Sequence, residues 1–129
     1  MLDNFIAMRY DLKMKSTAVY LRVSTDRQSK GLEAQERILL SYLKDQQIKN
    51  YQIYRDEGVS GAKASRPQLD LMMSAVRNGF HETVLVYSFS RFARSTRHLL
   101  TALEDFQSLN VSFISLTEKV DTSSPMGRA

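Results

Sequence analysis

The chain has 129 residues, of which 43% are hydrophobic, and only 5 glycines and 2 prolines, which fits one compact domain with a hydrophobic core. The absence of cysteine excludes disulfide bridges and thiolate metal sites, and no apolar run approaches the roughly 18 residues of a membrane span, so we expect a soluble, intracellular protein. Lys and Arg exceed Asp and Glu by 18 to 14, and this net charge of +4 is compatible with a polyanionic partner.

The first expected element is a buried strand over residues 17–23, where β-forming side chains dominate, and polar residues follow it. A helix is expected from about residue 33 to 47 because its apolar side chains share one face, as a helix lying on a sheet requires. Those side chains belong to Ala34, Ile38, Leu39, Tyr42 and Leu43. The sequence YQIY, residues 51–54, predicts a short second strand.

The next segment is DEGVSGAKAS, residues 56–65, whose glycines and small residues predict an exposed, mobile loop. A helix follows, with Ser65 as a plausible N-cap, Pro67 in the first turn and Gly79 at its end. Its apolar side chains have helical spacing at Leu69, Met72, Met73 and Val76.

The second half continues the alternation of strands and helices. Residues 83–87 predict a strand that is apolar throughout, as expected when both faces are covered. A polar turn, SFSRFARST, leads into a helix that extends to about residue 109, and residues 111–116 predict a fourth strand. This order favours an α/β fold with a mainly parallel central sheet flanked by helices on both faces.

Residues 1–15 are expected to lie outside this fold, and residues 117–129 are expected to form a tail after the fourth strand. Residues 1–15 have no secretory signal pattern and are predicted to be a poorly ordered N-terminal extension to a domain over residues 16–129. Near the other end, Ser123 or Ser124 followed by Pro125 would cap another helix, so the chain looks truncated at that helix.

Polar side chains gather where the predicted strands end, which is where ligands bind in open parallel sheets. Arg22 and Ser24 lie two apart on an extended chain and would point to the same side. Arg91 and Arg94 lie three apart and would share a face if that turn is helical. No acidic residue occurs between residues 83 and 103, so this region would favour phosphate.

These residue types suit chemistry at a phosphodiester. The guanidinium group matches phosphate oxygens and stays charged, and Arg66 would bring a further one from the predicted loop. Ser24 offers a nucleophile, and the arginines would stabilise the charge of the transition state without a metal.

Other interpretations compete with this one. Ser24 would be an ordinary turn residue in a non-catalytic phosphate- or nucleotide-binding regulatory module, although no Gly-rich phosphate loop occurs. Asp56 and Glu57 would hold Mg²⁺ in a metal-dependent nuclease, but one adjacent pair is weak evidence. His81 and His98 belong to no visible ligand set and are interpreted as packing or surface residues.

Five motifs in order resemble the serine site-specific recombinases, the resolvase and invertase family. YLRVSTDRQ resembles the nucleophile motif, and GLEAQ the start of the first helix. DEGVSGAKASRPQLD resembles the loop and following helix, YSFSRFARS the second arginine cluster, and VDTSSPMGRA the approach to the long dimer-forming helix. The resemblance extends from about residue 17 to the end and implies the resolvase-like catalytic fold.

The resemblance also implies roles for individual residues. Ser24 matches the nucleophile that becomes joined to a DNA 5′-phosphate, and Gln28, Gln35 and Asp56 match residues that help to order the site. The arginines that grip the scissile phosphate are matched by Arg22, Arg66, Arg91 and Arg94. Ser90 is also expected to help order the site, although it departs from the family pattern, in which many members have Asp. A carboxylate there could orient an arginine or handle a proton, whereas a serine hydroxyl only hydrogen-bonds more weakly.

The implied activity is metal-independent and cofactor-free DNA recombination by cleavage, strand exchange and religation through a 5′-phosphoserine intermediate. The implied partners are DNA and further copies of the protein, in a homodimer and a synaptic homotetramer, with site recognition located further along the chain. The implied location is the cytoplasm, in a prokaryotic or mobile-element setting.

Overall fold

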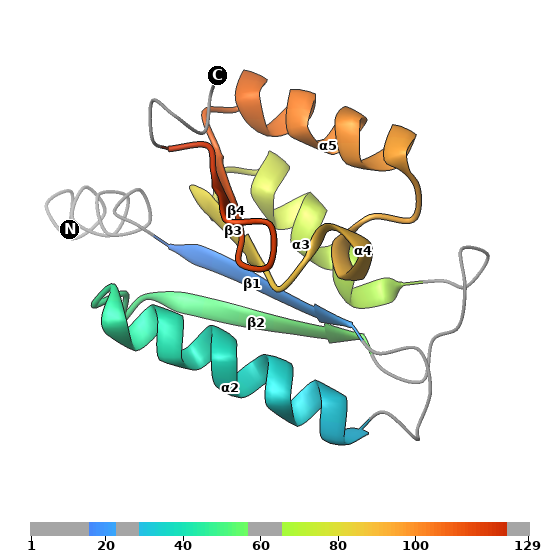
Figure 1. Ribbon diagram of the computed structural model, residues 1–129. Coiled ribbons are helices and arrows are strands. Elements are labelled where there is room, and N and C mark those ends of the chain that lie inside the picture. The colour runs from blue at the N-terminus through green and yellow to red at the C-terminus, as the bar shows by residue number, and fades with distance from the viewer. Residues whose placement is uncertain (1–15, 23–28, 57–65, 124–129) are drawn as a thin grey trace, which may run out of the picture.

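The computed structural model describes residues 16–22, 29–56 and 66–123, which form an α/β structure around one sheet (Figure 1). In this part of the chain the sheet has five strands in the order β2-β1-β3-β4-β5. Their bounds are β1 Thr17–Arg22, β2 Tyr51–Asp56, β3 Thr83–Val86, β4 Ser112–Ser115 and β5 Val120–Asp121.

Strands β1 to β4 are parallel, so their carboxyl ends meet at one edge of the sheet. In the register, Arg22 lies opposite Asp56, and Tyr20 lies opposite Val86. Strand β5 is the exception, because it pairs antiparallel with β4 through a tight turn in which Lys119 has φ 59°. The mainly parallel sheet was predicted, whereas β5 falls in a segment that was expected to be a tail.

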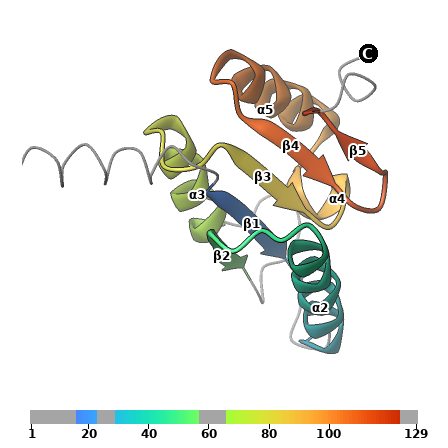
Figure 2. The same ribbon diagram turned by 90° about the vertical axis from the view of Figure 1, so that its left-hand side faces the viewer.

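Helix α2, Ser29–Asp45, covers one face of the sheet (Figure 2). Its Leu39 and Leu43 pack against a buried layer from β1, β3 and β4, which comprises Val19, Leu21, Leu85 and Ile114. The alternate side chains of β1 point the other way, as the pleat of a strand requires, and Ala18 and Tyr20 join the second core.

The opposite face is covered by α3, Pro67–Arg77, α4, Phe89–Phe92, and α5, Thr96–Ser108 (Figures 1 and 2). The core on this side is rich in rings, with Phe92, Phe106 and Phe113 fully buried and in mutual contact. The prediction of helices on both faces is therefore confirmed. Within the described segments, no helix is long and apolar enough to cross a membrane.

The bounds of α2 and β2 differ most from the sequence prediction. Helix α2 begins at Ser29, before the apolar repeat, and ends at Asp45, after which Gln47 adopts φ 58°. Strand β2 continues to Asp56, which was expected to open a loop. Helix α3 ends as predicted ahead of Gly79, whose φ of 83° suits glycine.

The N-terminus of α3 corrects the predicted cap. The N-cap position belongs to Arg66 and not to Ser65, and the Arg66 side chain makes no cap hydrogen bond. The backbone N–H groups of Gln68 and Leu69 instead donate to the two carboxylate oxygens of Asp56, each at 3.0 Å. A side chain at the end of β2 therefore caps α3 from another element.

Candidate active site

The short helix α4 forms where the sequence predicted only a turn. Ser88 adopts an extended conformation and its Oγ accepts a hydrogen bond from the Arg91 N–H at 3.2 Å, which is an N-cap. Phe92 is fully buried and Ala93 returns to an extended conformation, so one helical turn is anchored at both ends. Phe89 packs against the same core from the start of the turn.

The carbonyl end of α4 binds the guanidinium group of Arg22. Arg22 Nη2 donates to the carbonyl oxygen of Ser90 at 3.1 Å, and Nε donates to that of Arg91 at 3.3 Å. The last turn of a helix leaves carbonyl groups without helical partners, and cations are stabilised there. The end of β1 and the second arginine cluster therefore meet, as expected.

The same carbonyl end also binds Arg66. Its Nη1 donates to the carbonyl oxygen of Phe92 at 3.1 Å, and the residue is only 2% exposed. Its Nε is buried and has no hydrogen-bond partner among the described residues. Arg66 is thus fixed within the structure at the N-terminus of α3, and one of its donors remains unused.

Arg94 is positioned by its backbone. It follows the C-cap of α4, so the condition for Arg91 and Arg94 to share a helical face is not met. The Arg94 N–H donates to His98 Nδ1 at 3.0 Å, and the His98 ring stacks on Phe92 with centroids 5.7 Å apart. His98 therefore packs as predicted and also holds the backbone of Arg94.

The four arginines form one electrostatic group. Burial lowers the pKa of Arg22, and the positive charges of Arg66 and Arg91 lower it further. Burial also lowers the pKa of Arg66, and Arg94 acts in the same direction, whereas Tyr20 and Asp56 oppose it. Among the described residues, none of the four is within salt-bridge distance of a carboxylate. Such a group favours an anion that would offset the repulsion.

Asp56 is surrounded by hydrogen-bond donors. It is 3% exposed, and besides the two N–H groups of α3 its Oδ2 accepts the Tyr20 hydroxyl at 2.9 Å. Burial, with the negative charge of Asp56 and this hydrogen bond, raises the pKa of Tyr20 well above its usual value. Tyr20 therefore stays protonated, and its hydrogen bond to Asp56 connects β1 to the end of β2.

The remaining predicted site residues are placed in different ways. The carbonyl oxygen of Ser90 accepts a hydrogen bond from Arg22, and Ser90 Oγ lies 3.2 Å from Ser88 Oγ. Gln35 lies in α2 and is 5% exposed, with a buried Oε1 that has no partner in the described residues. Ser24 and Gln28 lie outside the described residues.

The predicted magnesium pair finds little support in this geometry. Both oxygens of Asp56 already accept hydrogen bonds from protein donors, which compete with a cation for the same lone pairs. No group of three or more potential ligands gathers within the described segments. Glu57 lies outside them.

Two residues with structural roles at this site, Tyr20 and Glu118, were not singled out from the sequence, and the contact of His98 with the Arg94 backbone was not predicted. Tyr20 binds Asp56, His98 binds the Arg94 backbone, and Glu118 accepts the N–H of Phe89 at the start of α4. His98 follows Arg94 by four residues, a spacing that offered a local signal. Tyr20 and Glu118 act across 36 and 29 positions, so the local pattern contains no sign of them.

Comparison with known proteins gives consistent matches. Residues 17–129 match the family model described as "Resolvase, N terminal domain". The chain is 41% identical over 109 residues to the Transposon Tn917 resolvase of Enterococcus faecalis, covering 84% of this chain and 53% of the relative. It is 35% identical over 109 residues to the DNA-invertase of Escherichia phage P1, with the same two coverages. The chain thus spans about half the length of these curated relatives.

Among solved structures, the N-terminal catalytic domain of TP901-1 integrase superposes with a TM-score of 0.76 at 37% identity, covering 88% of this chain and 87% of that one. A resolvase family site-specific recombinase from Streptococcus pneumoniae gives a TM-score of 0.71 at 32% identity, covering 88% and 81%. The family model, the relatives and the fold agree with one another. This chain belongs to the resolvase family of serine recombinases and carries its N-terminal catalytic domain.

Proposed function

We propose that the protein carrying this domain performs site-specific DNA recombination, with Ser24 as the nucleophile and Arg22, Arg66, Arg91 and Arg94 around the scissile phosphate. The observation that carries this proposal is the convergence of Arg22 and Arg66 on the carbonyl end of α4, beside the segment that holds Arg91 and Arg94. Three separate parts of the chain thereby present guanidinium groups at the edge of the sheet where β1 ends.

The proposed step exchanges one phosphodiester for another. The Ser24 hydroxyl oxygen bonds to phosphorus, the bond from phosphorus to the DNA 3′ oxygen breaks, and the hydroxyl proton ends on that oxygen. The product is a 5′-phosphoserine link and a free 3′ hydroxyl, and the reverse reaction rejoins DNA. Because the phosphate gains charge on its non-bridging oxygens, the arginines stabilise the transition state more than the ground state.

Asp56, Gln28 and Gln35 are proposed to order this site. For Asp56 the support is its hydrogen bonding to Tyr20 and to α3, which fixes the position of Arg66 at the start of that helix. Ser90 is proposed to have no acid–base role, because a neutral hydroxyl bonded to Ser88 has no carboxylate to offer. DNA and further copies of the protein, as a homodimer and a synaptic tetramer, are the proposed partners, acting in the cytoplasm.

The test is covalent capture of DNA. The full-length protein is incubated in EDTA with a nicked suicide substrate of its recombination site, and protein–DNA adducts are separated on a denaturing gel. We expect an adduct with the wild-type protein and none with Ser24→Ala. DNA binding without an adduct would favour a non-catalytic phosphate-binding module, and cleavage that requires Mg²⁺ would favour a nuclease; either result contradicts the proposal.

A further inference from the structure

The turn between β4 and β5 is attached to the chain just before α4. The Thr117 N–H and the Thr117 hydroxyl both donate to the carbonyl oxygen of Tyr87, at 2.9 and 2.8 Å. The Leu116 N–H donates to the carbonyl oxygen of Val86 at 3.2 Å. The turn therefore sits directly beside the entry to α4, although some 30 residues separate the two segments.

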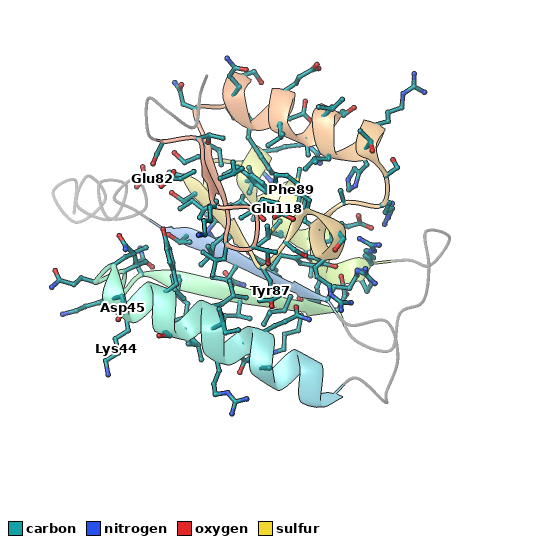
Figure 3. The ribbon with its side chains drawn as sticks, in the orientation of Figure 1. Lys44, Asp45, Glu82, Tyr87, Phe89 and Glu118 are labelled. Atoms are coloured by element: carbon teal, nitrogen blue, oxygen red, sulfur yellow. The ribbon has the colours of Figure 1, made fainter. Side chains whose placement is uncertain are left out.

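Glu118, at the tip of this turn, contacts the first residue of α4 (Figure 3). The Phe89 N–H lies 3.2 Å from Glu118 Oε1 and 3.4 Å from Oε2. Ser115, at the end of β4, donates its hydroxyl to the same Oε1 and thereby orients the carboxylate. Because the first N–H groups of a helix have no helical partners, a carboxylate here stabilises α4 by hydrogen bonding and by charge.

The carbonyl end of α4 lies at the candidate active site. Its carbonyl oxygens bind Arg22 and Arg66, as described above. Since α4 has only four residues, Glu118 and these two guanidinium groups are separated by a single helical turn. A shift of the start of α4 would move the carbonyl groups that fix both arginines.

We propose that Glu118 is a positioning residue of the recombinase, which holds α4 at the orientation that presents Arg22 and Arg66 to the scissile phosphate. It touches no reacting atom and acts through the α4 backbone. Its catalytic consequence rests on the proposed function, but its effect on the two arginines does not.

A competing explanation is that Glu118 stabilises only the turn between β4 and β5. That turn is closed independently by the Lys119 N–H, which donates to the carbonyl oxygen of Leu116 at 3.2 Å. Because the turn has its own backbone hydrogen bond, loss of the Glu118 side chain should leave the turn formed and release mainly α4. The two explanations therefore differ in what happens to the arginines.

The first measurement needs no DNA. The Nε–Hε resonances of Arg22 and Arg66 are assigned by NMR in the chain and followed in Glu118→Ala. Glu104→Ala, which removes an exposed carboxylate from α5, is the control. We expect both resonances to move in Glu118→Ala and to stay in place in the control. Unchanged resonances in a folded Glu118→Ala would overturn the proposal.

Glu118→Gln keeps the measurement informative if the alanine variant does not fold. Its amide oxygen still accepts the Phe89 N–H but lacks the charge, so we expect displacements of the same resonances that are smaller than those of the alanine variant. Resonances identical to the wild type in Glu118→Gln, with Glu118→Ala unfolded, would count against positioning and for a purely structural role.

The second measurement is the single-turnover rate of adduct formation on the suicide substrate. We expect Glu118→Ala to slow it by about tenfold or more with unchanged DNA affinity, because small misplacements of catalytic groups cost on the order of 10–100-fold. General destabilisation would instead reduce the fraction of active protein at an unchanged rate, and that outcome contradicts the proposal. If the wild type forms no adduct, the proposed function fails, while the NMR result still decides the effect of Glu118 on the arginines.

Discussion

His81 lies buried between two hydroxyl groups on the side of the molecule away from the arginines. Its Nδ1 is 2.9 Å from Ser16 Oγ and its Nε2 is 2.8 Å from Tyr54 Oη, and the residue is 6% exposed. Burial lowers the pKa of His81 because the charged ring would lose its hydration. His81, which belonged to no visible ligand set in the sequence, thus connects the segment before β3 to β2 and to the residue that precedes β1.

The lowered pKa of His81 predicts how stability depends on pH. Below about pH 6.5 the unfolded chain takes up a proton that folded His81 resists, so stability is complete above that pH and is lost below it. We expect a loss of up to about 1.4 kcal/mol per pH unit until folded His81 itself protonates. The measurement is urea unfolding from pH 7.5 to 5 for the wild type and His81→Gln.

His98 also has a lowered pKa, so the wild type alone would not isolate the effect of His81. The difference between the two curves removes the contribution of His98, because it is present in both proteins. Parallel curves over this pH range would show that His81 is not the group responsible.

At the scale of elements, α3 depends on a carboxylate from β2. Asp56 accepts hydrogen bonds from two N–H groups of α3 and from the hydroxyl of Tyr20, and two of these three hydrogen bonds are buried. An N-cap from a neighbouring strand fixes the angle between helix and sheet, which a cap within the helix does not do. This arrangement links the stability of α3 to the position of Arg66.

Replacing Asp56 should therefore be costly. We expect Asp56→Ala to lower the free energy of unfolding by about 2–4 kcal/mol, because it removes the cap and leaves buried donors without partners. The matched control is Asp45→Ala, which removes an exposed carboxylate at the end of α2 and should have little effect. Equal stability of the two variants in urea unfolding would show that Asp56 does not cap α3 in solution.

The elements also show where sequence patterns succeed. Helices α2, α3 and α5 were predicted because each buries one apolar face, and this leaves a period in the sequence. Helix α4 has four residues, too few for an apolar repeat to recur, and β5 has two. Both are stabilised by contacts between distant segments, such as Glu118 with Phe89, which local propensity does not record.

Part of the candidate site could be predicted from the sequence, and part could not. The meeting of Arg22 with the segment of Arg91 and Arg94 followed from the parallel sheet, since strand ends share an edge. The hydrogen-bond acceptors of these arginines could not be predicted, because they are backbone carbonyl oxygens of α4 and a sequence pattern does not indicate a backbone acceptor. The burial of Arg66 was also missed, as it was expected at the end of an exposed loop.

For the whole molecule, the net charge of +4 and the group of four arginines predict DNA binding by the chain that is weak, without marked sequence preference and sensitive to salt. If four phosphates are neutralised, the logarithm of the binding constant should fall with the logarithm of salt concentration with a slope of about −4. The measurement is fluorescence anisotropy with labelled duplexes over a range of salt.

The contribution of the arginine group is tested by the double variant Arg91→Ala, Arg94→Ala, which should make the slope smaller by about 2. Arg37→Ala with Lys44→Ala is the matched control, since both residues are exposed on α2, which covers the face of the sheet opposite α4. Equal slopes for the two double variants would show that DNA does not contact the arginine group.

The identity of the reacting residue is the central claim, and one measurement addresses it directly. The protein–DNA adduct formed in EDTA is digested with protease and nuclease, and the peptide that retains a nucleotide is sequenced by mass spectrometry. The account predicts a nucleotide attached through its 5′-phosphate to the oxygen of Ser24. Attachment to any other residue would contradict it.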